Sequence, residues 1–251
     1  EPGHEPAEYY ETNIYGADNV CEWCDLIKCH DLIFTSSIAP YGLAENKKDE
    51  ASLPVPLTPY GGSKLVAEKI HIGWQRSSPE NQLTVVRPGV VFGPGEGGNV
   101  SRLIKAVLGG YFFYMGNQET RKAGVYVKEL AAAMDWVHTQ NKIKGNSFSL
   151  FNMSMKQAPS MKEYVDTILQ VSKRKKYIFS IPFVFLYPAS FVVSLLATLL
   201  RVNQPINPVR IKKLIKSNYI DPSYLRENKY EYKYTLLTAL TDWKKHMPEE
   251  W

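Results

Sequence analysis

Segments with helical and strand periodicity alternate along the first 152 residues, and this alternation limits the folds open to the chain. Apolar residues recur at helical spacing in the longer segments, and short runs rich in β-branched residues lie between them. Strands separated by helices of this length need right-handed crossovers, which produce a parallel sheet covered on both faces. We expect helices over residues 13–28, 60–76, 100–108 and 127–138, and strands over residues 31–36, 83–87 and 147–152.

The last hundred residues follow a different pattern. Helices are predicted over residues 160–171, 207–217 and 236–246, and residues 177–200 contain no charged side chain. An uncharged helix of that length is long enough to span a bilayer. Pro182 and Pro188 interrupt it, which favours a helix of a small lobe. An interfacial membrane contact and a true membrane span are the two alternatives.

A tyrosine, a lysine and a serine form the pattern with the clearest chemical meaning. In Tyr60-Gly-Gly-Ser-Lys64 the tyrosine and the lysine are four positions apart, so they share one face of a helix. Free tyrosine titrates near pH ~10, and a cation held beside it favours the phenolate. Ser37 follows a predicted strand, where its hydroxyl is placed to hold a substrate oxygen. We therefore predict a site that removes a proton from an alcohol while a hydride leaves its carbon.

The surroundings of this pattern resemble those in the extended short-chain dehydrogenase/reductase superfamily, and within it the NAD-dependent epimerase/dehydratase family. Phe34-Thr-Ser-Ser-Ile-Ala-Pro-Tyr-Gly42 lies upstream, the proline-rich loop 53–59 leads into the helix, and Leu83-Thr-Val-Val-Arg-Pro88 lies downstream. The resemblance implies an α/β fold with a Rossmann-like parallel sheet that lacks its first strands, and a smaller, mostly helical C-terminal substrate lobe. It assigns a partial dinucleotide-binding domain to residues 1–152 and the lobe to residues 153–251, with some elements interleaved.

The resemblance also implies roles for individual residues. Tyr60 would be the catalytic acid/base and Lys64 its partner, while Ser37 would orient the substrate alcohol, with Ser36 as the alternative. Contacts to the cofactor, NAD or NADP, are expected from Asn13, Ser36, Tyr60, Lys64, Pro88, Val90 and Val91. Contacts to the substrate are expected from Ser37, Asn99, Arg121 and Lys122. For Asn13 and Asn99 the alternative role is a helix N-cap.

A dinucleotide site needs a glycine-rich turn at a helix N-terminus for its phosphates. Gly93-Pro-Gly-Glu-Gly-Gly98 is the only match to that pattern in the sequence. We reject it, because Pro94 lacks an N–H group, Glu96 adds negative charge, and the preceding strand contains Arg87-Pro88. In the family, the phosphate loop precedes the stretch that resembles residues 9–20. We therefore expect an N-terminally truncated domain without that loop.

Composition narrows the class of partner and leaves several functions open. The formal net charge of +5 is modest, and no basic stripe interleaved with aromatics indicates nucleic acid. Cys21, Cys24 and Cys29 have a metal-like spacing, but without a second ligand cluster we expect packing in a helix and no metal site. Free thiols and a polar N-terminus favour a cytoplasmic protein. A homodimer and a peripheral membrane contact through residues 177–200 are also compatible with the sequence.

Three functions fit these observations. The first is an NAD(P)-dependent epimerase or oxidoreductase acting on a nucleotide sugar, with Tyr60 as proton acceptor. Ile38-Ala39 after Ser37 argue against a dehydratase, because relatives with that activity carry acidic residues there. The second is a hydroxysteroid-dehydrogenase-like oxidoreductase on an apolar substrate, which would explain the uncharged residues 177–200. The third is a non-catalytic binding protein, since the phosphate loop is not found.

Overall fold

The computed structural model describes residues 5–42, 46–182, 184 and 217–251. Two compact units, both discontinuous in sequence, make up the chain. The first unit comprises Glu1–Val91, Gly124–Lys156 and Ile220–Lys233, and the second comprises Phe92–Ala123, Gln157–Tyr219 and Tyr234–Trp251. The predicted boundary at residue 152 differs from this division, because residues 92–123 belong to the second unit and residues 220–233 return to the first. The helix predicted over residues 207–217, apart from residue 217 itself, and most of residues 177–200 lie outside the described residues.

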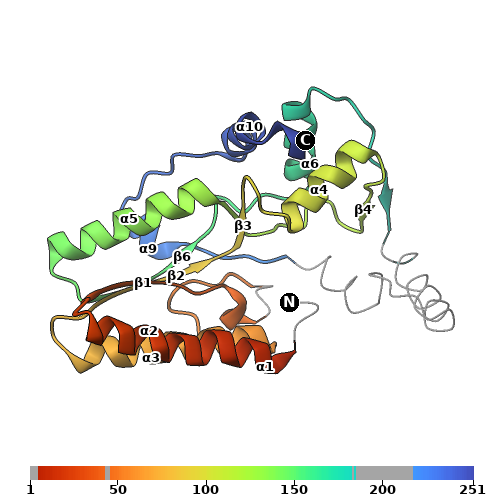
Figure 1. The fold of residues 1–251 in the computed structure, drawn as a ribbon. Coiled ribbons are helices and arrows are strands. Elements are labelled where there is room, and N and C mark those ends of the chain that lie inside the picture. The colour runs from red at the N-terminus through yellow and green to blue at the C-terminus, as the bar shows by residue number, and fades with distance from the viewer. Residues whose placement is uncertain (1–4, 43–45, 183, 185–216) are drawn as a thin grey trace. The chain divides into compact units, whose positions relative to one another are not determined.

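A parallel three-stranded sheet forms the centre of the first unit (Figure 1). The strand order is β1-β2-β6, and Val85 in the middle strand is paired with Phe34 on one side and Leu150 on the other. The middle strand is buried along nearly its whole length, as expected for a parallel strand covered on both faces. The strands are β1 (Asp31–Thr35), β2 (Gln82–Pro88) and β6 (Phe148–Met153).

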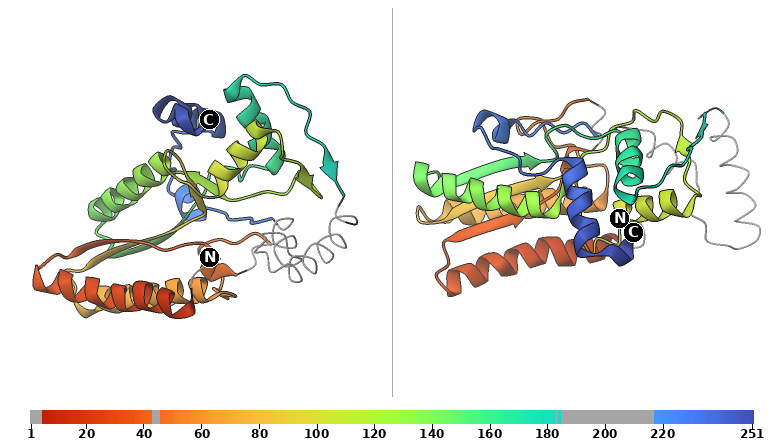
Figure 2. Two further views of the ribbon diagram at one scale, coloured as in Figure 1. Left: turned by 45° about the vertical axis from the view of Figure 1, so that its right-hand side comes forward. Right: turned by 90° about the horizontal axis from the view of Figure 1, so that it is seen from above.

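Helices cover both faces of this sheet (Figures 1 and 2). On one face, the N-terminal helical segments pack with the long helix that contains Tyr60 and Lys64. On the other face, two helices contact the sheet, the second of which comes from the returning residues 220–233. The first group is α1 (Pro6–Tyr9), the π-helix η1 (Tyr10–Tyr15), α2 (Gly16–Leu26) and α3 (Pro59–Ser77), and the second is α5 (Val127–Lys144) and α9 (Ser223–Glu227).

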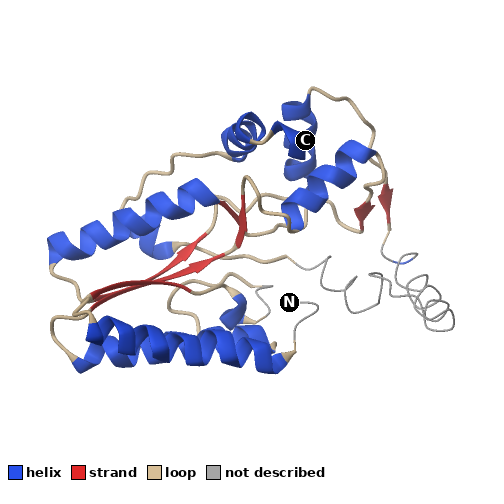
Figure 3. Cartoon of the chain, in the orientation of Figure 1, coloured by secondary structure: helices blue, strands red, loops and turns tan. Residues whose placement is uncertain are grey.

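Among the described residues of the second unit, helices predominate over strands (Figure 3). Its helices α4, α6 and α10 pack together, with Phe92 stacked on Trp243 at 6.3 Å between ring centroids. Two-residue strands β4 and β7 pair in parallel beside them. The elements are α4 (Asn99–Gly109), β4 (Tyr114–Met115), α6 (Met161–Ser172), β7 (Ser180–Ile181), α10 (Leu236–His246) and the 3-10 helix η3 (Pro248–Glu250).

The described residues include two further short strands. Strand β3 (Val90–Phe92) follows β2, and strand β5 (Gly124–Tyr126) precedes α5. Gly89 separates β3 from the end of β2. In the described part of the chain, no helix combines the length and the apolar character needed to cross a membrane.

Candidate active site

Helix α3 carries the predicted tyrosine and lysine, and its start is firmly fixed. The Thr58 hydroxyl accepts a hydrogen bond from the Gly61 N–H at 3.1 Å, and Pro59 occupies the first helical position. Both features are preferred at helix N-termini because they satisfy or remove N–H groups that have no helical partner. Tyr60 and Lys64 therefore lie in the first turns of α3, one turn apart, as the sequence predicted.

The loop that follows β1 lies against this first turn of α3. A Cβ atom placed on Gly61 would come within 2.7 Å of the Ala39 carbonyl oxygen, closer than real Cβ contacts. By contrast, a Cβ atom on Gly62 would meet nothing within 4 Å. The glycine at position 61 thus permits a close approach between helix and loop, which is one of the recurrent uses of glycine. This approach brings the segment after β1 beside Tyr60.

Ser37 lies in this loop and Ser36 lies at its buried end. The Ser37 hydroxyl is half-buried and accepts a hydrogen bond from the Ala39 N–H at 3.1 Å. The next N–H, from Ile38, donates to the Pro88 carbonyl at 3.1 Å, which holds the loop against the end of β2. Ser36 is only 3% exposed, and its hydroxyl donates to the Glu68 carboxylate at 2.5 Å. Ser37 is therefore the better placed of the two serines for substrate, and the cofactor contact of Ser36 stays a prediction.

Lys64 extends from α3 towards the end of β1. Its ammonium donates to the Thr35 carbonyl at 3.2 Å and lies 5.1 Å from the centre of the Phe34 ring. Burial lowers the pKa of Lys64, and the nearby Glu68 carboxylate partly opposes this shift. Tyr60 packs its ring against Tyr9 with 5.6 Å between centroids. The Lys64 ammonium is thus held at the end of β1, and the Tyr60 ring is held against Tyr9 of the N-terminal helix.

Asn13 supports α3 from the N-terminal helix. Its side-chain amide donates to the Ser63 hydroxyl at 3.0 Å, and that hydroxyl donates to the Tyr60 carbonyl at 2.9 Å. The alternative role as an N-cap is wrong, because Asn13 lies inside the π-helix η1 and the helical segment begins earlier, at Pro6. π-Helical turns are rare and frequently occur at functional sites. The contact is compatible with the predicted role of Asn13 in steadying the active-site helix.

A buried ion pair beneath the site was not predicted from the sequence. Arg87 at the end of β2 makes two hydrogen bonds to Glu68 on α3, at 2.8 and 2.6 Å, and their side chains are only 5% and 1% exposed. The guanidinium also lies 4.7 Å from the centre of the Tyr41 ring, and the Tyr41 hydroxyl donates to Asn152 at 2.8 Å. Burial alone would lower the pKa of Arg87, but the contact with Glu68 outweighs it and raises the pKa.

This polar chain joins the ends of all three strands to the active-site helix. Ser36 follows β1, Arg87 lies on β2 and Asn152 lies on β6, while Glu68 is one turn beyond Lys64 on α3. The sequence signal was present, since Glu68 continues the four-residue spacing of Tyr60 and Lys64, and Arg87 ends an apolar strand. A charged side chain is usually exposed to solvent, so neither Glu68 nor Arg87 taken alone indicates a buried partner. The pairing of these two residues therefore could not be deduced from the sequence.

The glycine-rich loop 93–98 lies in the second unit and already contains an anion. The Glu96 carboxylate accepts hydrogen bonds from the Ser101 N–H at 2.8 Å and from the Ser101 hydroxyl at 2.7 Å. It thereby occupies the N-terminus of α4, the end of a helix at which phosphate groups commonly bind in other proteins. The N-cap position belongs to Gly98, so the alternative role of Asn99 as an N-cap is wrong; its side-chain oxygen accepts a hydrogen bond from Arg102. Its predicted substrate contact stays a prediction.

Arg121 and Lys122 also belong to the second unit. The Arg121 guanidinium donates to the Ala158 carbonyl at 2.7 Å and lies 3.5 Å from the Glu163 carboxylate near the start of α6. The Lys122 N–H donates to the Pro159 carbonyl. These contacts fix the segment next to α6 and leave its predicted contact with substrate as a proposal.

The cysteines pack against a helix. Cys21 and Cys24 form a buried cluster with Trp74 of α3, and burial raises the pKa of Cys21 to about 11. Cys29 is half-buried, and its sulfur contacts the Asp31 carbonyl. Among the described residues, no group of three or more His, Cys, Asp and Glu side chains is arranged to hold a metal ion.

The residues present fit one half of a nicotinamide dinucleotide. The side chains of Tyr60 and Lys64 and the loop that carries Ser37 gather around the start of α3, which suits a ribose and a reacting alcohol. The phosphate half has no equivalent in loop 93–98, because Glu96 already binds the N–H groups there. The described residues therefore have the chemistry expected of the proton-transfer side of such a site, and that role stays a prediction.

Comparison with known proteins agrees with this geometry. Residues 3–150 match the family described as "NAD dependent epimerase/dehydratase family". The chain belongs to this NAD-dependent epimerase/dehydratase family. Members of the family are NAD-dependent by that description, and the matched residues contain Ser37, Tyr60 and Lys64.

Relatives within the epimerase/dehydratase family include several 4-epimerases. A protein of Escherichia coli O157:H7, N-acetyl-alpha-D-glucosaminyl-diphospho-ditrans,octacis-undecaprenol 4-epimerase, is 28% identical over 233 residues, which cover 92% of this chain and 70% of that protein. A 2-alkyl-3-oxoalkanoate reductase of Shewanella oneidensis is 24% identical over 258 residues, covering 95% of this chain and 64% of the relative. The chain thus spans about two thirds of the length of these curated relatives.

Solved structures confirm the Rossmann-like α/β fold. The UDP-N-acetylglucosamine 4-epimerase from Bacillus cereus superposes with a TM-score of 0.73 at 18% identity, and the match covers 98% of this chain and 75% of that one. The UDP-N-acetylglucosamine 4-epimerase from Methanobrevibacter ruminantium gives a TM-score of 0.72 at 20% identity, covering 98% and 72%.

Proposed function

We propose that this chain provides the proton-transfer half of an NAD(P)-dependent 4-epimerase that acts on a sugar carried by a diphosphate. The observation that carries the proposal is that two side chains and one loop of the expected chemistry all lie at the start of α3. Tyr60 and Lys64 lie one turn apart at the start of α3, and the loop that carries Ser37 is held against the same turn through Gly61.

The roles of the side chains follow from their positions. Ser37 accepts one hydrogen bond from the backbone and retains its own proton to orient a sugar hydroxyl. Tyr60 takes the proton from that hydroxyl, and the ammonium of Lys64, fixed on Thr35, stabilises the phenolate. The nicotinamide cofactor, when bound, supplies the hydride acceptor. Return of the hydride to the opposite face of the keto sugar would invert the carbon, and Tyr60 would return the proton.

The substrate class is inferred from the relatives. The names of the Escherichia coli protein and of the two solved 4-epimerases each describe an amino sugar linked to a diphosphate, on a lipid in the first case and on a nucleotide in the others. A diphosphate-linked sugar is the feature common to all three. The relatives carry the sugar on two different carriers, a lipid diphosphate and a nucleotide diphosphate, and they are at most 28% identical to this chain. The assay therefore tests both carriers.

Replacing Tyr60 with phenylalanine tests the proposal. The complete protein that contains these residues is purified and incubated with NAD⁺ and either UDP-N-acetylglucosamine or its undecaprenyl diphosphate counterpart, and the 4-epimer is quantified by chromatography. Y60F should reduce turnover by about 10²–10⁴-fold, since general acid–base catalysis contributes that much. Binding of NADH, measured by fluorescence, should change little. The control is Y10F, which alters a tyrosine that is 45% exposed on η1.

Two outcomes would contradict the proposal. Near-normal turnover of Y60F would show that another group takes the proton. A complete wild-type protein that is folded by circular dichroism yet binds no NADH would instead favour a non-catalytic binding protein.

A second candidate function is a reductase or dehydrogenase with an apolar substrate. The Shewanella oneidensis relative, named as a 2-alkyl-3-oxoalkanoate reductase, covers 95% of this chain, and residues 177–200 contain no charged side chain. The same three side chains suit this chemistry, because a carbonyl reduction also needs a proton donor. Turnover of a 3-oxo acid or a hydroxysteroid, with none of either sugar diphosphate, would decide for this candidate.

A further inference from the structure

Four consecutive cations follow helix α6 in the second unit. Residues 173–176 read Lys-Arg-Lys-Lys, and all four side chains are exposed. Lys173 ends the helix in the left-handed conformation, with φ 55°, so the chain turns away from the helix axis there. A run of like charges repels itself, and such a run in an ordered segment requires compensation or a function.

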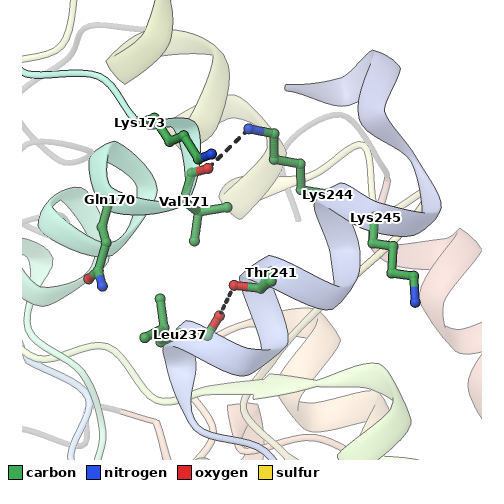
Figure 4. A pocket seen from close by; sticks show the side chains of 7 residues that line it. All are labelled: Gln170, Val171, Lys173, Leu237, Thr241, Lys244 and Lys245. Atoms are coloured by element: carbon green, nitrogen blue, oxygen red, sulfur yellow. Dashed lines mark hydrogen bonds between the residues drawn. The ribbon is translucent and has the colours of Figure 1, made fainter.

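Part of the run has a structural role. Arg174 and Lys176 both donate to the Leu108 carbonyl at the end of α4, at 2.9 and 2.6 Å. Lys244 of α10 donates to the Val171 carbonyl at the end of α6, at 3.0 Å. Cations at the C-termini of helices are stabilised by the helix dipole. Figure 4 shows Lys173 and Lys244 converging on this end of α6, whereas Lys245 points away from it.

These hydrogen bonds position the cations without neutralising them, because carbonyl groups carry no net charge. In the part of the chain that the structure describes, none of residues 173–176 or Lys244 forms an ion pair with a carboxylate. The acids nearby are bound elsewhere, since Asp166 pairs with Lys162 at 2.5 Å and Asp242 with His246 at 3.4 Å. The positive charge is therefore left for an external partner.

Exposed aromatic rings lie beside these cations. Tyr177 is 92% exposed and Phe179 53%, and pairing of β7 with β4 fixes the segment that follows them. Tyr111, 68% exposed, lies three residues after Leu108, whose carbonyl binds Arg174 and Lys176. Cations with exposed aromatic rings suit the boundary between lipid headgroups and acyl chains. The basic–aromatic surface consists of Tyr111, Lys173, Arg174, Lys175, Lys176, Tyr177 and Phe179.

We propose that the basic–aromatic surface binds the surface of an anionic phospholipid bilayer. Cations near such a surface are attracted to it, each by roughly a fivefold gain in affinity, and the aromatic side chains would insert at headgroup depth. A lipid surface is favoured over nucleic acid because Val184, next along the chain, is apolar and 68% exposed, and no charge follows in the sequence until Arg201. This inference does not rest on the proposed reaction.

Sedimentation with vesicles tests the proposal without any substrate. The chain is mixed with vesicles of phosphatidylcholine alone or with added phosphatidylglycerol, at low and at raised salt. Binding should require phosphatidylglycerol and should weaken as salt is added. K173Q/K175Q, which removes two exposed cations that make no helix-capping bond, should lower the affinity about 25-fold. The matched control, K69Q/K233Q, removes two exposed lysines of the first unit and should have little effect.

A second variant tests the aromatic contribution. Y177S replaces the most exposed ring of the basic–aromatic surface and leaves all its cations in place, so it should weaken binding even at raised salt. Three results would overturn the proposal: no binding to anionic vesicles, equal loss of binding in the two lysine double variants, or tighter binding to an oligonucleotide at the same phosphate concentration. Each is independent of whether the chain turns over a sugar diphosphate.

Discussion

Replacing Arg87 with methionine removes the cation that holds the Glu68 carboxylate beneath the active-site helix. The carboxylate would keep its hydrogen bond from Ser36 but would lose both hydrogen bonds from the guanidinium. Methionine approximates the length of the arginine stem and adds no charge. The single variant therefore leaves a buried, uncompensated anion in the first unit.

The burial of the pair sets the magnitude of the expected effect. Because both side chains are at most 5% exposed, solvent does not screen the lost interaction. Removal of one partner of such a buried pair typically costs about 3–5 kcal/mol, against about 0–1 kcal/mol for an exposed pair. The free energy of unfolding of a whole domain is typically about 5–15 kcal/mol, so the loss of the ion pair would remove a large fraction of it. E68M/R87M removes both charges and should restore most of the loss.

Urea unfolding of the four proteins of this cycle measures the coupling between the two residues. R87M and E68M should each lower the free energy of unfolding by about 3–5 kcal/mol, and the double variant should lose much less than their sum. If R87M does not fold, the test is whether the double variant E68M/R87M folds, because removal of both charges should restore folding.

The exposed ion pair Lys162–Asp166 provides the matched control. Its side chains are 46% and 55% exposed, so K162M should shift the urea midpoint little. Additive losses in the Glu68–Arg87 cycle, or an R87M loss as small as that of K162M, would refute the claim that this ion pair fixes α3 on the strand ends.

Two further predictions concern the packing around α3. G61A should lower stability because its methyl group would meet a carbonyl at 2.7 Å, while the neighbouring G62A, in open space, should be neutral or stabilise by up to about 1 kcal/mol; equal midpoints in urea would contradict the close approach. At pH 8 a maleimide should label Cys29 first, because burial raises the pKa of Cys21 to about 11 and also raises that of Cys24; mass spectrometry that finds Cys21 modified first in the folded chain would contradict its burial.

Much of the fold could be predicted because the helices and strands of this chain carry strong periodic patterns. Helix α10 has the predicted bounds, and most of the other predicted helices and strands among the described residues begin and end within two residues of expectation. Two helices run further than predicted: α5 continues past residue 138 to Lys144, and the helical segment that contains Asn13 begins at Pro6. The π-helix around Asn13 was missed, because one inserted residue per turn hardly alters an apolar pattern. The two-residue strands β4 and β7 are too short to produce an alternation.

The shared position of Tyr60 and Lys64 was predictable for a different reason. Their four-residue spacing places them on one face of a helix, and a sequence displays that spacing directly. The contacts of Glu68 with Arg87 and of Glu96 with α4 depend on how the chain folds back, and charge alone gives several alternative partners. The return of residues 220–233 to the first unit is a contact of the same kind, since Ile220 bridges to Lys48.

That return has a consequence for synthesis of the chain on the ribosome. The core of the first unit includes Leu225 and Tyr230, and the Tyr230 hydroxyl donates to the buried Glu129 at 2.6 Å. The sheet can form earlier, but the core that covers it stays incomplete until residue 230 has left the exit tunnel. Contacts this distant in sequence slow folding and prolong the exposure of apolar surface. The nascent chain should therefore depend on chaperones for longer than one whose first domain is continuous.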